Sequence, residues 1–326
     1  MKKFAKWVSS GIIFVVVLGA LLFIFGPYEK SDLSAKFDAS VLGDGVESYF
    51  ATQESRFDDI TPGVQKQVIW AEGPEQESHW SILYVHGFSA TAQEIRPVPD
   101  QVAAALGANL VLTRLTGHGR DGAALADATV ADWMADLAEG LAVARLVGER
   151  VLVISASTGG TLATAAALDP KLAVDVAGLV LISPNYGLNT GFEPLLTLPA
   201  ARYWLPPLAG AERSFEPANE DHATYWTTSY PSVAVLPMAA LVKKVANLDV
   251  GQTKIPALFW YSKQDRVVRP EITSRIAGTW GGPVTVFRPT LGPSDDAAAH
   301  VIAGDIMSPG QNETTVQGIL DWVKGL

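Results

Sequence analysis

Residues 151–168 decide the fold, and they read Val-Leu-Val-Ile-Ser-Ala-Ser-Thr-Gly-Gly-Thr-Leu-Ala-Thr-Ala-Ala-Ala-Leu. The first four residues are apolar and mostly β-branched, which predicts a short buried strand. The last part is a run of small residues and leucine that suits a buried helix. Ser157 lies midway between the two parts. The stretch therefore predicts a sharp turn from a strand into a helix, with a serine at its apex.

Such a turn is tight, so the positions two before and two after the serine must be small, and Ser155 and Gly159 are. The turn lifts the serine clear of the sheet and points the N-terminus of the helix at it. Free N–H groups and the helix dipole favour an oxyanion there. Ser157 is therefore a candidate nucleophile; the alternative is a serine-rich turn before a packed helix. The motif resembles the Gly-x-Ser-x-Gly signature of the alpha/beta-hydrolase family, with Ser155 in place of the first glycine.

A second motif, His86-Gly87-Phe88, directly follows an apolar run at 81–85 that predicts a strand. In alpha/beta-hydrolases this loop supplies one backbone N–H to the oxyanion hole. The resemblance implies that Phe88 and Thr158, the residue after the serine, are the two donors. Residues 116–119, Thr-Gly-His-Gly, resemble a Pro-Gly-His-Gly loop of the family, which we expect to be structural. The motifs are most similar to those of the monoacylglycerol-lipase and carboxylesterase-like branch.

A serine nucleophile needs a base, and in this family the histidine comes late in the chain, after the acid. The sequence has five histidines: His79, His86, His118, His222 and His300. Two of them, His222 and His300, follow Ser157. His222 has no strand before it, whereas His300 follows the last predicted strand, 284–287. We therefore expect His300 to be the base, the alternative being a surface loop histidine.

The base needs a carboxylate that orients it, and this residue should lie just past the end of a strand. Asp265 does so, because it follows the predicted strand 257–261 in an Asp-x-Val-Val context similar to that of the family. Asp295 and Asp296 compete for the role from the loop of His300 itself. We favour Asp265 as the acid.

Strands and helices alternate across residues 65–326, which predicts an α/β fold with a mostly parallel sheet covered by helices on both faces. Strands are expected at 68–71, 81–85, 110–115, 151–154, 178–183, 257–261 and 284–287. The alternation stops at about 184–250, where aromatic residues and prolines are frequent. The resemblance implies that this segment is a cap over the site, whose apolar inner face would bind an acyl chain or an aromatic group. The remainder would be the alpha/beta-hydrolase domain.

The N-terminus carries an uncharged stretch, residues 7–28, preceded by Lys2, Lys3 and Lys6. Twenty-two uncharged residues are enough to span a bilayer as a helix. We expect residues 1–28 to be an uncleaved transmembrane anchor, with a cleaved signal segment as the alternative. Residues 29–64 would be a stalk. The lysine balance predicts the N-terminus inside and the catalytic domain on the extracytoplasmic side.

Composition restricts the remaining function classes. The net charge of −10 gives nucleic acid no basic surface to bind, and without cysteine there is no disulfide or thiolate metal site. We expect no metal and no cofactor. The predicted function is a membrane-anchored serine hydrolase that cleaves carboxylic esters, with small-molecule or lipid esters such as monoacylglycerols or lysolipids as substrates. The alternatives are an acyltransferase or thioesterase with the same triad and a non-catalytic binding protein on this fold. The sequence leaves the oligomeric state open.

Overall fold

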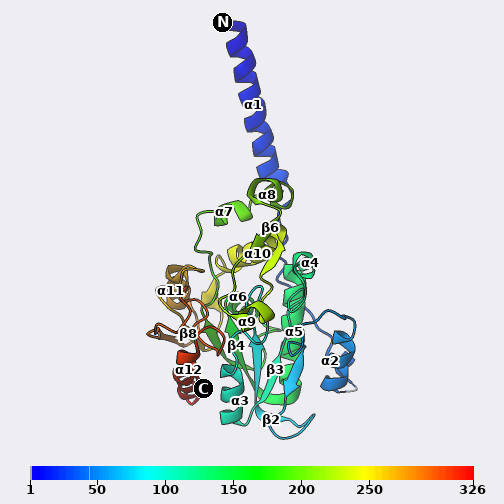
Figure 1. Cartoon of the computed structure of the whole chain (residues 1–326), viewed down its shortest axis with the longest axis vertical. Helices are drawn as coiled ribbons and strands as arrows, with labels where there is room; N and C mark the ends of the chain where they lie inside the picture. The colour runs from blue at the N-terminus through cyan, green and yellow to red at the C-terminus, as the bar shows by residue number, and fades with distance from the viewer. Residues whose placement is uncertain (1, 44) are drawn as a thin grey trace.

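A twisted seven-stranded sheet forms the centre of the computed structural model, which describes residues 2–43 and 45–326 (Figure 1). The strand order is β1-β3-β2-β4-β5-β8-β9. The strands are β1 (Gln67–Ile69), β2 (Ser78–Val85), β3 (Asn109–Leu112), β4 (Gly148–Ala156), β5 (Val176–Ile182), β8 (Ala257–Trp260) and β9 (Val284–Phe287). All neighbours pair in parallel except β1, which runs antiparallel to β3 at the edge. The predicted α/β architecture is confirmed.

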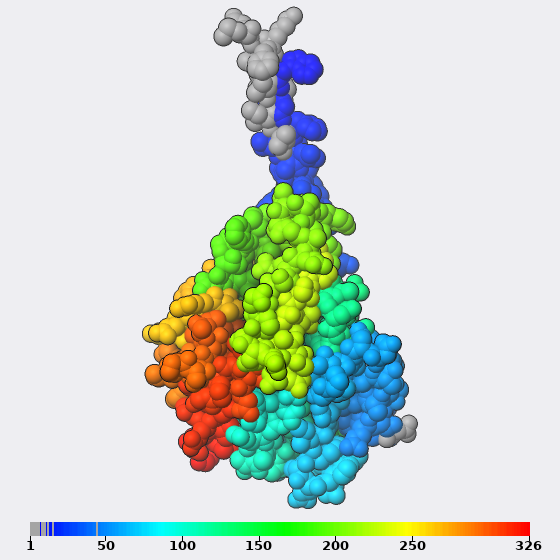
Figure 2. All heavy atoms as spheres, viewed as in Figure 1, coloured from blue at the N-terminus to red at the C-terminus, as the bar shows by residue number. Residues whose placement is uncertain are grey.

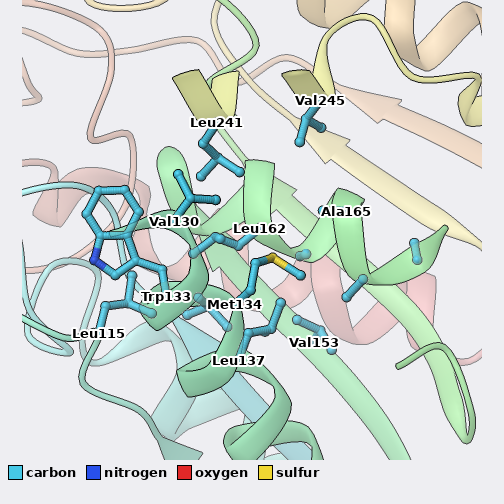
Figure 3. Packing of buried hydrophobic residues seen from close by; sticks show 14 of the residues in the cluster. Leu115, Val130, Trp133, Met134, Leu137, Val153, Leu162, Ala165, Leu241 and Val245 are labelled. Atoms are coloured by element: carbon cyan, nitrogen blue, oxygen red, sulfur yellow. The ribbon is translucent and has the colours of Figure 1, made fainter. Parts of the chain in front are cut away.

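Helices cover both faces of this sheet, as expected. One face carries α3 (Val98–Leu106) and α12 (Asn312–Val323). The other carries α5 (Val130–Val147), α6 (Thr158–Ala167), α10 (Val235–Val245) and α11 (Pro270–Thr279). Figure 3 shows the second layer, where Trp133, Met134 and Leu137 of α5 pack between β4, α6 and α10. Burial of these side chains is the main driving force for the layered arrangement.

Helix α5 begins where the sequence provides a capping box. The Thr129 hydroxyl accepts the N–H of Asp132, and the Asp132 carboxylate accepts the N–H of Thr129. The box satisfies two backbone donors that have no partner within the helix. The helix then places Val130, Trp133, Met134 and Leu137 on its buried face.

Strand β4 lies in the middle of the sheet and directs the chain to the site. Its residues 151–156 are buried on both faces, because parallel strands on each side and helices above and below enclose it. Val85 at the end of β2 pairs with Ser155, and Ala156 at the end of β4 pairs with Ile182 in β5. The carboxyl ends of three adjacent strands therefore meet at one edge, where open α/β sheets bind ligands.

The segment expected to be a stalk, residues 29–64, contains a helix that joins the main core. Helix α2 (Val46–Glu54) buries Val46 and Phe50 beside α5. The Tyr49 hydroxyl donates to Glu139 at 2.6 Å, and Glu54 forms a buried ion pair with Arg114 at 2.7 Å. Part of this segment thus packs on the hydrolase domain; the boundary at residue 65 stays a prediction.

The segment at 184–250 interrupts the sheet with short elements. They are α7 (Glu193–Leu196), α8 (Ala201–Ala209), the antiparallel pair β6 (Glu212–Ser214) and β7 (Ser229–Pro231), α9 (Glu220–Tyr225) and α10. In Figure 2 they form the yellow-green surface between the blue N-terminal helix and the rest of the molecule. Helix α10 differs from the others because it packs against α6 in the main core. The cap boundaries stay a prediction.

Helix α1 (Lys2–Phe25) projects from the end of the molecule that carries α7 and α8 (Figure 1). In the residues described, none of the helices has both the length and the apolar character needed to cross a bilayer. The expected transmembrane anchor, and the location derived from it, are therefore not supported. The helix stops three residues before the predicted end at Tyr28, because the Pro27 ring lacks an amide hydrogen to continue it.

Candidate active site

Ser157 lies at the strand–helix turn, where the sequence predicts it. It follows the last residue of β4 and precedes the first residue of α6, with φ 49° and ψ −118°. A non-glycine residue in this left-handed region is strained, and such strain persists only where the surroundings enforce it. Here the Ser157 N–H donates to the Ile182 carbonyl at 3.0 Å, and the Ser157 carbonyl accepts the Asn185 N–H at 3.0 Å.

The contacts around Gly159 explain why the motif needs a small residue two positions after the serine. A Cβ atom on Gly159 would lie 2.2 Å from the Val85 carbonyl oxygen and 2.7 Å from the His86 carbonyl oxygen. The absence of a side chain lets α6 start directly against the end of β2. Ser155 is fully buried and donates to the Val180 carbonyl at 3.1 Å, so its hydroxyl is satisfied within the sheet.

His300 and Asp265 come from two different loops and meet Ser157 at this edge. His300 Nε2 lies 2.9 Å from Ser157 Oγ, and His300 Nδ1 lies 2.8 Å from Asp265 Oδ2. The second oxygen of Asp265, Oδ1, accepts the N–H groups of Val267 and Val268 at 2.8 and 2.9 Å. A chain of hydrogen bonds from hydroxyl through imidazole to carboxylate can move the serine proton to the ring.

The other candidates for acid and base lie elsewhere. Asp296 accepts the backbone N–H groups of His300 and Val301 at 2.9 Å each, so it shapes the loop without bonding the ring. Asp295 binds the Gly292 N–H and the Gln311 side chain, both at 2.6 Å. His222 is in α9 and accepts the Ala218 N–H at 3.0 Å. The geometry favours Asp265 and His300 over all three.

Charges around His300 suit it to accept a proton. Burial lowers the pKa of His300, but the Asp265 carboxylate raises it through charge and hydrogen bond. Glu94 and Asp296 raise the pKa further, and the net shift is upward from the ordinary histidine value. An imidazolium formed by taking a proton from Ser157 is therefore stabilised within the site.

The expected oxyanion donors flank the serine. Within residues 2–43 and 45–326, the Phe88 and Thr158 amides donate no hydrogen bond to a protein group. Free amides beside a nucleophile can stabilise an oxyanion. His86 holds the loop, because its Nε2 accepts the Leu115 N–H at 3.1 Å and its Nδ1 lies 2.9 Å from the Gly87 carbonyl oxygen. Burial lowers the pKa of His86 to about 4, so this ring stays neutral.

Sequence reasoning missed a buried carboxyl group beside the serine. Glu94 is 3% exposed, and its Oε2 accepts the Gly87 N–H at 2.7 Å and the Tyr84 hydroxyl at 3.2 Å. A signal was present: Glu94 is the single acidic residue in the mostly apolar stretch 78–99. Acidic residues are rarely buried without a partner, so a lone one in a buried segment next to a motif is informative.

Residues 82–303 match the model of the alpha/beta hydrolase family. A thermostable monoacylglycerol lipase of Bacillus sp. (strain H-257) is 30% identical over 197 residues, which cover 58% of this chain and 72% of that protein.

Solved structures that share the fold include two from lipolytic enzymes. One comes from work on LipS and LipT, two metagenome-derived lipolytic enzymes; it has a TM-score of 0.65 and 21% identity, and covers 82% of this chain and 100% of its own. The other is a soluble variant of monoglyceride lipase from Saccharomyces cerevisiae in complex with a substrate analogue. It has a TM-score of 0.59 and 12% identity, and covers 82% of this chain and 96% of its own.

Proposed function

The chain belongs to the alpha/beta hydrolase family, and we propose that Ser157, His300 and Asp265 are its nucleophile, base and orienting acid. It is a carboxylic ester hydrolase, as its lipase and esterase relatives indicate. The observation that carries the triad is the pair of hydrogen bonds at His300, 2.9 Å to Ser157 and 2.8 Å to Asp265. Because the chain is an ester hydrolase, the alternative of a non-catalytic binding protein on this fold is excluded.

The proposed reaction has two halves. First, His300 Nε2 takes the proton of Ser157 while the serine oxygen bonds to the ester carbonyl carbon, and the Phe88 and Thr158 amides hold the oxyanion. The C–O bond to the alcohol then breaks, His300 returns the proton to the leaving alcohol, and Ser157 carries the acyl group. In the second half, water gives a proton to His300 and attacks the acyl-enzyme, which releases the carboxylic acid and restores the serine hydroxyl.

We infer that the substrates are esters of lipids, with monoacylglycerols as the first candidate. Support comes from the monoacylglycerol lipase that is 30% identical to the chain. It also comes from the apolar residues exposed on the cap, which are Phe192, Leu195, Tyr203 and Leu208. Apolar side chains exposed on the cap favour contact with a lipid phase, where lipid esters are found.

We also propose that α1 attaches the enzyme to a lipid surface. Its exposed apolar side chains include Trp7, Ile13, Phe14, Val16, Leu18, Phe23, Ile24 and Phe25. Apolar side chains exposed on one helix favour a lipid interface. Two contacts join the base of α1 to the cap: the Ala200 N–H donates to the Pro27 carbonyl at 2.6 Å, and Glu29 pairs with Arg202 at 2.7 Å. Attachment through α1 would thus bring the cap near the lipid.

Replacement of the serine tests the triad. We expect Ser157→Ala to lower turnover on p-nitrophenyl butyrate on the order of a millionfold, because the remaining groups have no nucleophile to activate. The same variant should lose labelling by a fluorophosphonate probe. Ser274→Ala is the matched control, since the hydroxyl of Ser274, in α11, bonds the Tyr261 hydroxyl at 2.6 Å and not the proposed triad. A Ser157→Ala enzyme with near wild-type turnover would refute the assignment.

Substrate class is tested with purified enzyme and a series of monoacylglycerols, measured against p-nitrophenyl esters of matched chain length. The proposal expects free fatty acid as the product and kcat/KM that rises with chain length. Acyl groups recovered on an added alcohol or thiol, in place of free acid, would favour the acyltransferase alternative. Hydrolysis restricted to acetate and propionate esters would exclude lipid esters.

A further inference from the structure

Glu94 is buried on the turn that leads from β2 to α3, next to two loops of the site. Through Oε2 it holds the N–H of Gly87, the middle residue of the loop that carries the Phe88 amide. A Cβ on Gly87 would lie 2.8 Å from Glu94 Oε1 and 3.0 Å from Ser157 Cβ. The carboxyl group and the nucleophile therefore border the same small space beside Gly87.

The backbone of the same turn contacts the loop of His300. A Cβ on Gly304 would lie 2.8 Å from the Glu94 carbonyl oxygen and 2.6 Å from Ile95 Cα. The Asp305 N–H donates to the Arg96 carbonyl at 2.9 Å. Residues 94–96 thus hold the oxyanion loop through a side chain and the histidine loop through the backbone. A displacement of this turn would change both loops together.

We propose that Glu94 is a positioning residue for ester hydrolysis: its carboxylate fixes the Gly87 amide, and with it the Phe88 donor, and adds a negative charge near His300 to those of Asp265 and Asp296. This inference rests on the proposed triad. Two consequences follow. Loss of the acceptor at Oε2 would leave a buried N–H without a partner and free the loop, and loss of the charge would weaken the stabilisation of the imidazolium.

The charges around His300 and Glu94 determine in which direction the pKa of His300 changes when the Glu94 charge is removed. His300 faces Asp265 at its Nδ1, Asp296 within its own loop and Glu94 across the site, and each raises the pKa of the ring against the lowering effect of burial. Glu94 itself faces Tyr84, Gly87 and His300. Burial raises the pKa of Glu94; the Gly87 N–H, His300 and Tyr84 offset part of this, and the net shift is upward from the ordinary glutamate value. Removal of the Glu94 charge should therefore lower the pKa of His300.

The test compares two substitutions that separate these roles. Glu94→Gln keeps an oxygen that can accept the Gly87 and Tyr84 hydrogen bonds but removes the charge. Because the base works only when neutral, we expect the acid limb of kcat/KM to move to lower pH than in wild type. Glu94→Ala removes the acceptor as well, and kcat should fall on the order of tenfold to a hundredfold with little change in KM.

Asp321→Asn is the control, since it removes a carboxylate from α12 that is paired with Lys324 at 2.7 Å, outside the site. It should leave the pH profile unchanged. A wild-type acid limb in Glu94→Gln would overturn the role of the charge, and a folded Glu94→Ala enzyme with wild-type kcat would overturn the positioning role. If Glu94→Ala does not fold, Glu94→Leu, which fills more of the space and also lacks an acceptor, takes its place in the test of the positioning role. Failure of the triad itself would be seen separately, as an active Ser157→Ala enzyme.

Discussion

Asp265→Asn tests the site most sharply, because the structure dictates how the new amide must lie. Asp265 is 4% exposed, and its Oδ1 is held by the Val267 and Val268 N–H groups. An asparagine must keep its oxygen toward these two donors. Its NH2 group then faces His300 Nδ1, where Asp265 Oδ2 lies at 2.8 Å. Two donors cannot bond, so Nδ1 must become the acceptor.

That orientation fixes the wrong tautomer of His300. With Nδ1 unprotonated, the ring proton moves to Nε2, the atom that lies 2.9 Å from Ser157 Oγ and must accept its proton. The serine then has no base, and the imidazolium loses its partner charge. In serine proteases the equivalent change lowers turnover about ten-thousandfold, or roughly 5 kcal/mol of barrier. We expect a loss of the same order here.

Asp296→Asn provides the matched comparison, with the same isosteric change four residues before His300. The asparagine oxygen can still accept the His300 and Val301 N–H groups, so only the Ala298 N–H, at 2.9 Å, loses its acceptor. A loss of one such bond is worth about 1 kcal/mol. Turnover should therefore fall about tenfold or less.

The assay is the turnover of p-nitrophenyl butyrate by both variants on the high-pH plateau of the wild-type pH profile, with thermal unfolding measured alongside. The reasoning requires a folded Asp265→Asn enzyme that is several orders of magnitude slower than Asp296→Asn. If Asp296→Asn is the inactive variant and Asp265→Asn turns over normally, the partner of His300 lies in its own loop and the assignment fails.

Two further predictions concern the turn and the N-terminal helix. Gly159→Ala should lower Tm by roughly 5–10 °C, because the new Cβ would meet the carbonyl oxygens of Val85 and His86. Gly278→Ala is the control and should leave Tm unchanged, because a Cβ there meets nothing within 4 Å. Calorimetry measures both variants, and an unchanged Tm in Gly159→Ala would contradict the predicted clash. Removal of residues 1–25 should abolish flotation with phosphatidylcholine vesicles and keep kcat on soluble esters, provided that residues 26–29, which contact the cap, are retained. Flotation of the shortened enzyme equal to that of the full chain would refute attachment through α1.

The sequence was sufficient for the sheet and the turn because both follow local rules. Buried parallel strands appear as apolar runs, and a tight strand-to-helix turn demands small residues such as Gly159. Chain order limited the base to His222 or His300. The position just past a strand then selected His300 and Asp265, which lie 143 and 108 positions beyond Ser157, since β8 and β9 end at the same edge as β4.

Other features could not be read from the sequence, because they depend on packing between distant segments. Helix α2 lies in a polar stretch of residues, and only the fold shows that Val46 and Phe50 reach the main core. Glu94 reaches the Gly87 N–H because the chain turns back on itself between β2 and α3. The spacing of apolar residues in the sequence does not show this turn. The predicted span at 7–28 counted residues without charge, but helix length is also set by Pro27, which ends α1 at Phe25.

The two contacts between the base of α1 and α8 have a consequence for protein engineering. A cap that is held by Pro27 and Glu29 is not a contiguous module, although its own residues are contiguous in the chain. Exchange of the cap with that of a relative would leave the Arg202 guanidinium, or the Glu29 carboxylate, facing a foreign surface. A chimera that keeps the native contacts must transplant residues 26–29 together with the cap, as two discontinuous pieces.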